Sequence, residues 1–463
     1  MNSAIIKKHW PLIILLALAI ITRFWNLGEP PEVVFDEVHF GKFVSAYFTN
    51  EYYFDIHPPL GKLMIAAAAK FSGFTPNFDF DHIGETIGRR ALIGLRFLPA
   101  LFGSLSIGMI YLIIIALGYS RKAAFFGGWL MLFDNAYLVE SKFVLVDMFL
   151  IFFGATSLLF LSLASKASGK KSYFLICLAT AAATLAASIK WTGVAFIAII
   201  FFYLFLKLLK DRLLKKFFLT SFAAVLIALF LYVLPFIPHF SMLKKSGPGD
   251  AYMSAAFQKT LVGNKISTEN PAVPLNFSGK FTELNRAMYN YNSGLKATHP
   301  DGSKWNNWPF LKKPVYYWTK ALGERVGNIY LFGNPIVWWI GFGSLIAALL
   351  LLTIKKTRRK LGSEIYLLIF GYFINLLPFM LVARVAFLYH YLPALMFSIL
   401  IASFLAEKIL TWAKRYPIAS SSIYAVTLAG ILAFFLIISP LSYGFFIPKE
   451  TNTSYQNFLN RFR

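Results

Sequence analysis

The chain has 463 residues, of which 58% are hydrophobic and 18% are aromatic, while only 14% carry a charge. Ordinary soluble domains are about 45–50% apolar and about 25% charged, so this composition excludes a soluble globular enzyme, a disordered chain and a fibrous repeat. Apolar stretches of about 20 residues recur along the sequence, as in a polytopic membrane protein. The net charge of +24 comes from short basic clusters between these stretches, not from one patch, which argues against binding to nucleic acid.

Eleven apolar segments predict an all-α integral membrane fold. The first segment follows Lys7 and Lys8 and lacks a small-residue cleavage site, so we expect a retained span and not a signal peptide. The single cysteine, Cys177, lies in an apolar helix and cannot form an intramolecular disulfide. The expected spans are residues 10–23, 90–118, 122–138, 143–164, 173–188, 191–208, 217–238, 332–354, 364–383, 387–406 and 418–440.

The basic residues of the short connections set the expected orientation. One side of the predicted membrane carries the clusters, whereas the short connections of the other side carry only Lys142, Lys190 and Arg384. By the positive-inside rule the clustered side is cytoplasmic, so the N-terminus is predicted inside and the C-terminus outside. Two long loops, 24–88 and 241–330, then lie outside. The clusters lie at residues 7–8, 121–122, 166–171, 207–216, 355–360 and 408–415.

The first long loop concentrates acidic residues. It holds nine of the chain's 21 Asp and Glu residues, among them the adjacent pair Asp36–Glu37. Close carboxylates push one pKa upward, which suits one of the two for accepting a proton while a partner holds the other. The alternative is that both acids are solvated loop side chains.

A basic, apolar segment follows in the same loop. His57 and two prolines precede Leu60–Phe74, which is too short to span a membrane and includes Lys62 and Lys70. We expect a helix lying in the outer interface, with His57 and Lys62 near its N-terminus, where an anion can bind. Alternatively, the lysines only extend their charged ends toward water.

Several charged residues fall within or beside the predicted spans. Arg96 is flanked by apolar residues, and a charge at a helix centre costs about 2.5–3.5 kcal/mol on insertion scales, which makes it a functional candidate. Asp134, Asp147 and Arg384 lie near the outer ends of their spans, where they can line one external cavity or simply pair helices.

Other chemistries find less support. The sequence lacks a Walker loop, a G-x-G-x-x-G before a helix, H-E-x-x-H and paired C-x-x-C, so nucleotide, zinc and iron–sulfur sites are not predicted. No metal ligand is assigned, although Asp36, Asp134 and Asp147 leave a divalent cation open; their spacing is no known ligand signature. A transporter would show broken helices in paired half-repeats, and the sequence has no such symmetry.

Eight segments, taken together, resemble the protein O-mannosyltransferase family, whose members are membrane glycosyltransferases of the GT-C class. The segments occur in the family's order, from the first loop to the tenth predicted span. The resemblance implies a GT-C fold with about eleven spans and a cytoplasmic N-terminus. The segments are FDEVHFGKF, FDIHPPLGKLM, IGLRFLPALFG, DNAYLVESKFVLVDMFL, IKWTGV, LKATHPDGSKWNNWP, FGNPIVWW and RVAFLYHYLPAL.

The resemblance also implies an activity and roles for residues. Mannose would pass with inversion from the lipid donor polyprenyl-phosphate mannose to Ser or Thr hydroxyls of a protein. The chain would be a multi-pass protein of the cell (plasma) membrane, with its active site on the extracytoplasmic side. By match to the family's acidic pair, Asp36 would be the catalytic base and Glu37 its supporting partner. The expected neighbours of the donor phosphate are Arg96, as the foremost candidate, and His57, Lys62 and Arg384. A surrounding cavity is expected from Arg23, Asp134, Asp147, Tyr389 and His390.

The second long loop departs from the eukaryotic pattern. Eukaryotic members carry a β-trefoil MIR domain there, and the loop at 241–330 is too short for it, so the chain resembles a prokaryotic-type member. Its acceptor side is expected to include His299, Trp305 and Trp308. The expected parts are a catalytic membrane module (1–240), the acceptor-side loop (241–330) and C-terminal spans (331–463). Because nothing identifies the sugar, the alternative is a GT-C transferase that moves another polyprenyl-phosphate sugar onto a lipid or glycan.

Overall fold

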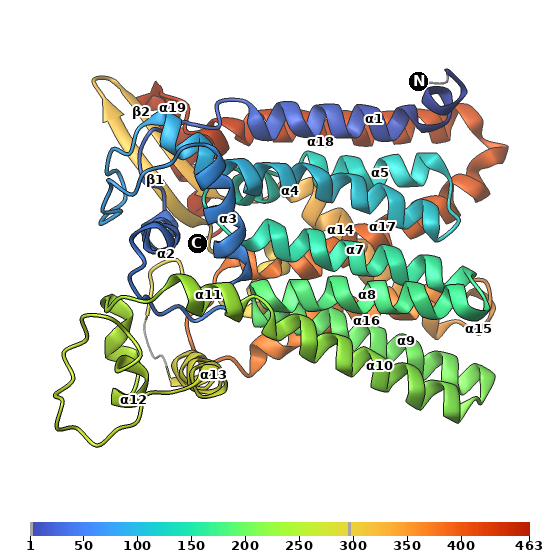
Figure 1. The fold of residues 1–463 in the computed structure, drawn as a ribbon. Coiled ribbons are helices and arrows are strands. Elements are labelled where there is room, and N and C mark those ends of the chain that lie inside the picture. The colour runs from blue at the N-terminus through green and yellow to red at the C-terminus, as the bar shows by residue number, and fades with distance from the viewer. Residues whose placement is uncertain (1–2, 295–297) are drawn as a thin grey trace.

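The computed structural model describes residues 3–294 and 298–463. Long helices run side by side, and both long loops gather at one end of them, together with the C-terminal residue (Figure 1). The start of the first helix lies at the opposite end. Residues 295–297, the first three of the segment LKATHPDGSKWNNWP, lie outside the described residues.

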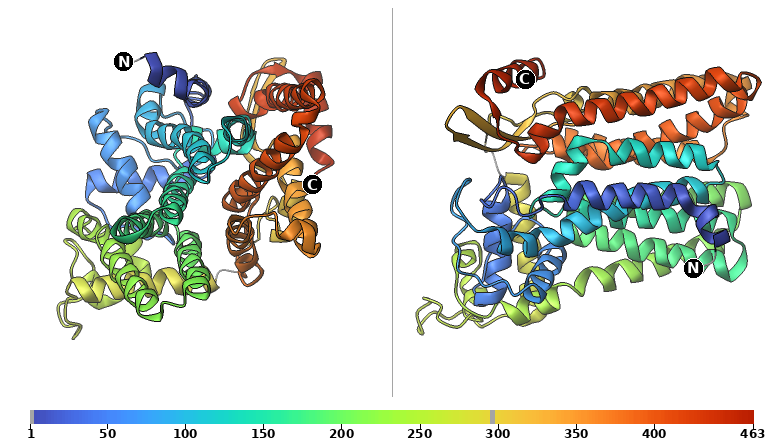
Figure 2. Two further views of the ribbon diagram at one scale, coloured as in Figure 1. Left: turned by 90° about the vertical axis from the view of Figure 1, so that its right-hand side faces the viewer. Right: turned by 90° about the horizontal axis from the view of Figure 1, so that it is seen from above.

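A bundle of long helices makes up most of the described chain. Figure 2 shows the C-terminal helices, orange to red, grouped on one side of the bundle and the N-terminal ones, blue to green, on the other. The bundle helices are α1 (Ser3–Phe24), α4 (Arg89–Ala116), α5 (Arg121–Leu132), α7 (Asp147–Lys166), α8 (Gly169–Ile189), α9 (Val194–Asp211), α10 (Leu214–Val233), α14 (Pro335–Thr353), α16 (Glu364–Leu376), α17 (Leu392–Trp412) and α18 (Pro417–Tyr443).

The lengths of these helices agree only partly with the expected spans. Eight of the described helices are long and apolar enough to cross a membrane, and the apolar helices His9–Phe24 and Glu364–Met380 are shorter. The outer surface fits a membrane, because α10 exposes large apolar side chains such as Phe218 and Phe230, at 65% and 64%. A helix satisfies its own backbone hydrogen bonds, so such a surface is stable against hydrocarbon. The predicted mostly helical membrane fold is confirmed, but the count of eleven spans is not.

The expected span 122–138 is interrupted. Helix α5 ends at Leu132, and the short helix α6 (Asn135–Lys142) begins anew after Asp134. The Asp134 carboxylate accepts hydrogen bonds from the backbone N–H groups of Ala136 and Tyr137, both at 3.1 Å, which satisfies the free donors of the α6 N-terminus. Asp134 therefore acts as a helix cap.

Shorter elements cover the end of the bundle that holds the long loops. The C-terminal helix α19 lies there beside the strands (Figure 1). A further short helix, α15 (Lys355–Arg358), lies at the opposite end. The elements at the loop end are α2 (Glu37–Thr49), α3 (Leu60–Phe71), α11 (Phe236–Met242), α12 (Ala255–Gln258), α13 (Phe277–Gly294), β1 (Val315–Leu322), β2 (Arg325–Leu331), β3 (Ile447–Pro448) and α19 (Lys449–Asn460).

The three strands form a small antiparallel sheet that was not expected from the sequence. Strands β1 and β2 make a hairpin whose turn contains Gly323 in the left-handed region, with φ +56°, and β3 pairs with β2. Two residues of β1 reach the first loop: Trp318 donates a hydrogen bond to Glu32 at 2.8 Å, and Lys320 forms an ion pair with the same carboxylate. The sheet thereby ties the second long loop to the first.

Candidate active site

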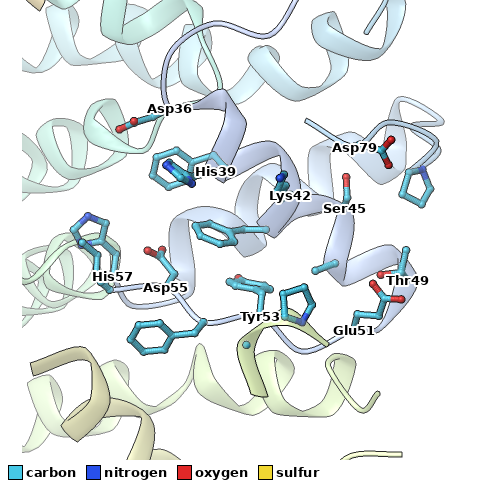
Figure 3. A pocket seen from close by; sticks show the side chains of 18 of the residues that line it. Asp36, His39, Lys42, Ser45, Thr49, Glu51, Tyr53, Asp55, His57 and Asp79 are labelled. Carbon is cyan, nitrogen blue, oxygen red and sulfur yellow. The ribbon is translucent and has the colours of Figure 1, made fainter. Parts of the chain in front are cut away.

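A cavity of about 710 Å³ opens between the two long loops. One wall consists of α2 and parts of the segments 51–57 and 76–81 that follow it. The other comes from the second loop, at residues 248, 249, 252 and 291. In Figure 3, Asp36 and His57 lie toward one end of the cavity, and Glu51 and Asp79 lie toward the other. The lining contains five carboxylates, although the chain as a whole is strongly basic.

A close backbone approach joins the two loops beside this cavity. The N–H of Gly249 donates to the carbonyl of Tyr52 at 3.0 Å, and a Cβ on Gly249 would lie only 2.4 Å from the carbonyl carbon of Tyr53. Only glycine permits this contact. Next to it, Phe54 stacks on Tyr252 at 4.4 Å between ring centroids, so the loops share an aromatic wall.

Asp36 presents a free carboxylate to the cavity. It occupies the N-cap position of α2, but its side chain does not cap that helix and makes no hydrogen bond among the described residues. The preceding Phe35 adopts a left-handed backbone conformation, with φ +47°, which is costly for an aromatic residue. Burial raises the pKa of Asp36, and the charges of Asp147 and Asp55 add to this effect, whereas His39 and Lys190 oppose it. Such a carboxylate can accept a proton.

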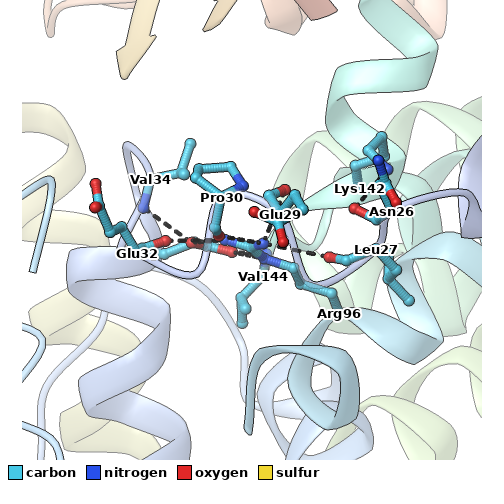
Figure 4. Close-up of polar contacts among 10 residues, drawn as sticks. Asn26, Leu27, Glu29, Pro30, Glu32, Val34, Arg96, Lys142 and Val144 are labelled. Atoms are coloured by element: carbon cyan, nitrogen blue, oxygen red, sulfur yellow. Dashed lines mark hydrogen bonds and ion pairs between the residues drawn. The ribbon is translucent and has the colours of Figure 1, made fainter. Parts of the chain in front are cut away.

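Glu37 has the opposite environment. Its side chain is completely buried and forms an ion pair with Arg96, with Nε–Oε1 at 2.7 Å. Figure 4 shows Arg96 and, close to it, Val34 and Val144. The backbone N–H groups of Val34 and Val144 donate to the two carboxylate oxygens of Glu37, each at 2.9 Å. Glu37 therefore joins the first loop to α4 and to the connection between α6 and α7.

Arg96 does not face the cavity, contrary to its predicted role beside a phosphate. It is completely buried, and all three guanidinium nitrogens donate hydrogen bonds within the protein. Besides Glu37, the acceptors are the backbone carbonyls of four residues of the first loop: Leu27, Glu29, Pro30 and Glu32. The anionic partner of Arg96 is therefore Glu37, which belongs to the acidic pair of the first loop.

Lys62 is likewise occupied within the protein, which gives no support to its predicted contact with a phosphate. Its ammonium forms an ion pair with Asp55 and donates to the carbonyls of His57 and Pro58, at 2.9 and 3.0 Å. These contacts use its three donors, and the residue is 2% exposed. The predicted helix with two prolines before it is present as α3 (Leu60–Phe71).

His57 remains at the cavity and lies among cations. Its half-buried ring lines the cavity and makes no hydrogen bond among the described residues. Burial lowers the pKa of His57 well below its usual value, and the charges of Lys190 and Arg384 lower it further. Arg384 is half-buried and forms no ion pair within the described part of the chain. The imidazole is therefore neutral at neutral pH, with positive charges nearby.

Lys190 belongs to this group although sequence reasoning did not select it. Its ammonium lies 2.6 Å from a carboxylate oxygen of Asp147 and 5.4 Å from the ring centroid of Tyr389. The segment IKWTGV contains Lys190. A lysine between two apolar helices is the feature of the sequence that could have indicated this residue. Asp147 is thus paired with Lys190 and does not line the cavity, contrary to expectation.

Two other predicted cavity residues are structural. Arg23 is completely buried and donates to the backbone carbonyl of Leu132 at 2.9 Å, so it closes the C-terminal end of α5. Asp134, besides capping α6, accepts hydrogen bonds from the Trp338 indole and the Asn334 backbone, both at 2.8 Å. Neither side chain reaches the cavity, because each satisfies a helix end inside the bundle.

Tyr389 and His390 lie behind the cavity. Their rings stack on each other with centroids 4.5 Å apart, and Tyr389 also contacts Phe35 edge-on at 6.2 Å. They are therefore near Asp36 without lining the main cavity.

The predicted acceptor-side residues do not line the cavity either. Trp308 is completely buried and donates to Ser303 at 2.9 Å, so its side chain is not available at the cavity for the expected contact with an acceptor. Trp305 packs partly against the core, and exposed His299 contacts Phe387 edge-on at 5.1 Å. The second loop instead reaches the cavity through Pro248, Gly249, Tyr252 and Tyr291.

The suggested cation ligands are also separated. Asp134 is a cap and Asp147 is paired with Lys190, so they cannot join Asp36 in one ligand set. Across residues 3–294 and 298–463, no three His, Cys, Asp or Glu side chains form a group that could hold a metal ion.

Solved structures with a similar fold define the class. The Saccharomyces cerevisiae protein O-mannosyltransferase Pmt1–Pmt2 complex bound to the sugar donor matches with a TM-score of 0.86 and 20% identity, over 95% of this chain and 90% of that one. ArnT from Cupriavidus metallidurans in the apo state matches with a TM-score of 0.54 and 14% identity, over 96% and 78% of the two chains. The fold is therefore that of a GT-C membrane glycosyltransferase.

Sequence comparison identifies the family within this class. A family model described as dolichyl-phosphate-mannose-protein mannosyltransferase matches residues 13–244, and one for the C-terminal four-span region of protein-O-mannosyltransferase matches residues 277–461. The chain belongs to the dolichyl-phosphate-mannose–protein mannosyltransferase family. Dolichyl-phosphate-mannose–protein mannosyltransferase 4 of Candida albicans is 36% identical over 272 residues, which are 55% of this chain and only 36% of that protein.

Proposed function

We propose that this chain transfers mannose, with inversion, from polyprenyl-phosphate mannose to the hydroxyl group of a Ser or Thr residue of a protein. The observation that carries the proposal is the contrast within the acidic pair. Within the described part of the chain, Asp36 keeps an unpaired carboxylate in a large cavity, while Glu37 is completely buried in an ion pair. One acid is thus available for chemistry and the other maintains the structure.

Asp36 acts as the general base. As the acceptor oxygen bonds to the anomeric carbon of mannose, the bond from that carbon to the phosphate oxygen breaks, and Asp36 takes the hydroxyl proton. Its raised pKa, caused first by burial, makes it a stronger proton acceptor than an ordinary aspartate while it is ionised. Polyprenyl phosphate leaves with the electron pair of the broken bond.

The departing phosphate is stabilised by Arg384, Lys190 and His57. These three groups take the role beside the phosphate that the sequence suggested for Arg96 and Lys62, whose donors are satisfied within the protein. Fixed cations in a poorly hydrated site stabilise negative charge that develops in a transition state. An arriving phosphate would also raise the pKa of His57, so that its ring could become a donor.

The acceptor enters through the cavity between the loops. The aromatic wall of Phe54, Tyr252 and Tyr291 faces α2 across this space, and the rings of Tyr252 and Tyr291 are 5.8 Å apart. An extended peptide segment can lie along such a wall and bring one hydroxyl to Asp36. The acidic lining favours acceptors that carry few negative charges.

The cavity lies on the extracytoplasmic side of the plasma membrane, with the N-terminus in the cytoplasm. The basic clusters and the gathering of both long loops at one end support this orientation. The division into 1–240, 241–330 and 331–463 follows the same topology, with the middle part on the acceptor side.

The test is a transfer assay with purified protein in lipid nanodiscs. Polyprenyl-phosphate mannose and a peptide with one Thr are expected to give a product heavier by one hexose, with the anomeric configuration inverted by nuclear magnetic resonance. The same peptide with Ala in place of Thr should remain unmodified. Hexose transfer to lipid but not to the Thr peptide would favour the alternative GT-C activity.

A further inference from the structure

We propose that Glu140 is a positioning residue that works as a neutral carboxylic acid: through Tyr317 it holds Phe35, and thereby fixes the direction of the Asp36 carboxylate. The inference rests on the proposed function, in which Asp36 accepts a proton. It adds a third acidic residue to the site, one that does not line the cavity.

Glu140 lies on α6, deep in the protein, and is 1% exposed. Its Oε1 accepts a hydrogen bond from the Tyr317 hydroxyl at 2.5 Å. Its Oε2 is also buried and has no hydrogen-bond partner among the described residues. A buried ionised carboxylate with one oxygen unsatisfied is costly, whereas a protonated carboxyl in the same place loses much less solvation.

Tyr317 carries the contact from α6 to the catalytic loop. Its ring stacks on Phe35 with centroids 4.2 Å apart and planes at 14°, and its backbone carbonyl accepts from the Phe35 N–H at 3.1 Å. Phe35 adopts the left-handed conformation directly before Asp36, so the surroundings must hold it there. Ring and backbone contacts from Tyr317 provide this support, and Glu140 anchors the phenol.

The charges around Glu140 favour its neutral form. The groups that act on it from neighbouring elements are Asp147, Tyr317, Lys190 and Asp36. Burial raises the pKa of Glu140 well above its usual value, and Asp147 and Asp36 add to the effect, while Tyr317 and Lys190 oppose it. Lys190 is already paired with Asp147. A neutral Glu140 leaves Asp36 free to ionise, because it adds no further negative charge beside it.

The protonation state can be measured without any activity. Infrared difference spectra of wild type minus Glu140→Gln at neutral pH should contain the C=O band of a protonated carboxyl. The matched control Glu269→Gln, at an exposed position, should show only carboxylate bands. The spectrum of Tyr317→Phe should still contain the band of the protonated carboxyl, but at higher frequency, because the C=O of Glu140 loses a hydrogen bond. A carboxylate band in the Glu140→Gln difference would overturn the proposal.

Kinetics then test the positioning role. Glu140→Gln is neutral and has the same shape, so turnover should stay within about twofold, and the acid limb of the kcat–pH profile should not move. Glu140→Ala should lower kcat on the order of 10²-fold at unchanged donor KM, because small displacements of a catalytic group are costly. If Glu140→Gln loses as much activity as Glu140→Ala, or moves the acid limb to lower pH, Glu140 acts as a charged group. If the wild type transfers no mannose, the proposed function fails, while the infrared result still decides whether Glu140 is neutral.

Discussion

Arg96 and Glu37 form a completely buried ion pair in which the guanidinium donates to both carboxylate oxygens, at 2.7 and 2.8 Å. Further donors of Arg96 bind the carbonyls of the loop that precedes Glu37. This pair fixes the backbone on which Asp36 stands. Asp36, which faces the cavity, is therefore positioned by its neighbour Glu37, which does not face the cavity.

Breaking this pair should destabilise the fold. Removing one partner of a buried ion pair leaves an uncompensated charge and typically costs about 3–5 kcal/mol. Glu37→Gln and Arg96→Ala should both lower the thermal unfolding temperature of the purified protein, whereas Glu324→Gln, at an exposed hairpin turn, should not. Arg96→Lys should rescue little, because an ammonium cannot supply the same set of planar donors. An Arg96→Ala protein of normal stability that only binds the donor poorly would restore the phosphate role.

The sequence predicted the class of the molecule and its acidic motif better than the surroundings of that motif. Apolar periodicity and basic clusters are local properties, and they identified the helical membrane fold. The partners of Arg96 and Lys62 could not be predicted in the same way. Each cation meets an acid of the first loop through tertiary contacts, at Glu37 and Asp55, so an isolated charge in the sequence looked available for a ligand.

The interrupted span and the sheet have similar causes. Asp134 appears as a charge near the end of an apolar run, but it caps α6, and nothing in the run itself predicts that break. Strand β1 pairs with the neighbouring β2, but it also depends on Glu32, which lies 286 residues before Trp318 in the sequence. Trp308 was expected on the acceptor side because it belongs to the second long loop, yet here it fills the core.

The pH profile should show the environment of Asp36. Only the ionised carboxylate can accept a proton, so kcat should fall as pH decreases through the pKa of Asp36. Because burial raises that pKa, the acid limb should lie above the ordinary range of an aspartate. The nearby charge of His39 lowers the pKa, so His39→Gln should move the limb to higher pH, while His82→Gln, at an exposed position, should leave it in place. An acid limb that does not respond to His39→Gln would argue against Asp36 as the titrating base.

Arg384 should contribute to donor binding. Hydrogen bonds to charged groups are worth about 1.5–3 kcal/mol, so Arg384→Ala should raise the donor KM by about tenfold to a hundredfold while acceptor KM changes little. Arg384→Lys should recover part of the loss, and Arg325→Ala, an exposed arginine on β2, serves as the matched control. A normal donor KM in Arg384→Ala would leave Lys190 and His57 as the phosphate contacts.

Orientation can be tested by labelling in intact cells. In a Cys177→Ser background, Glu324→Cys at the hairpin turn should react with an impermeant thiol reagent, because its side chain is 89% exposed. Lys356→Cys on α15, at the opposite end of the bundle, should react only after lysis. Ser303, which also lies in the second loop, is a less suitable position for the cysteine, since it is half-buried and accepts a hydrogen bond from Trp308. The reverse labelling pattern would place the cavity in the cytoplasm.

The single-turnover rate of mannose transfer by Asp36→Asn tests the central claim most directly. Asparagine keeps the size of the side chain and an acceptor oxygen, and Asp36 makes no hydrogen bond within the described chain, so the variant should fold and bind donor normally. Loss of general-base assistance should lower the rate by about 10²–10⁴-fold, whereas Asp211→Asn, at the far end of the bundle, should transfer mannose as the wild type does. A folded Asp36→Asn protein that transfers mannose at the wild-type rate would contradict the assignment of Asp36 as the base.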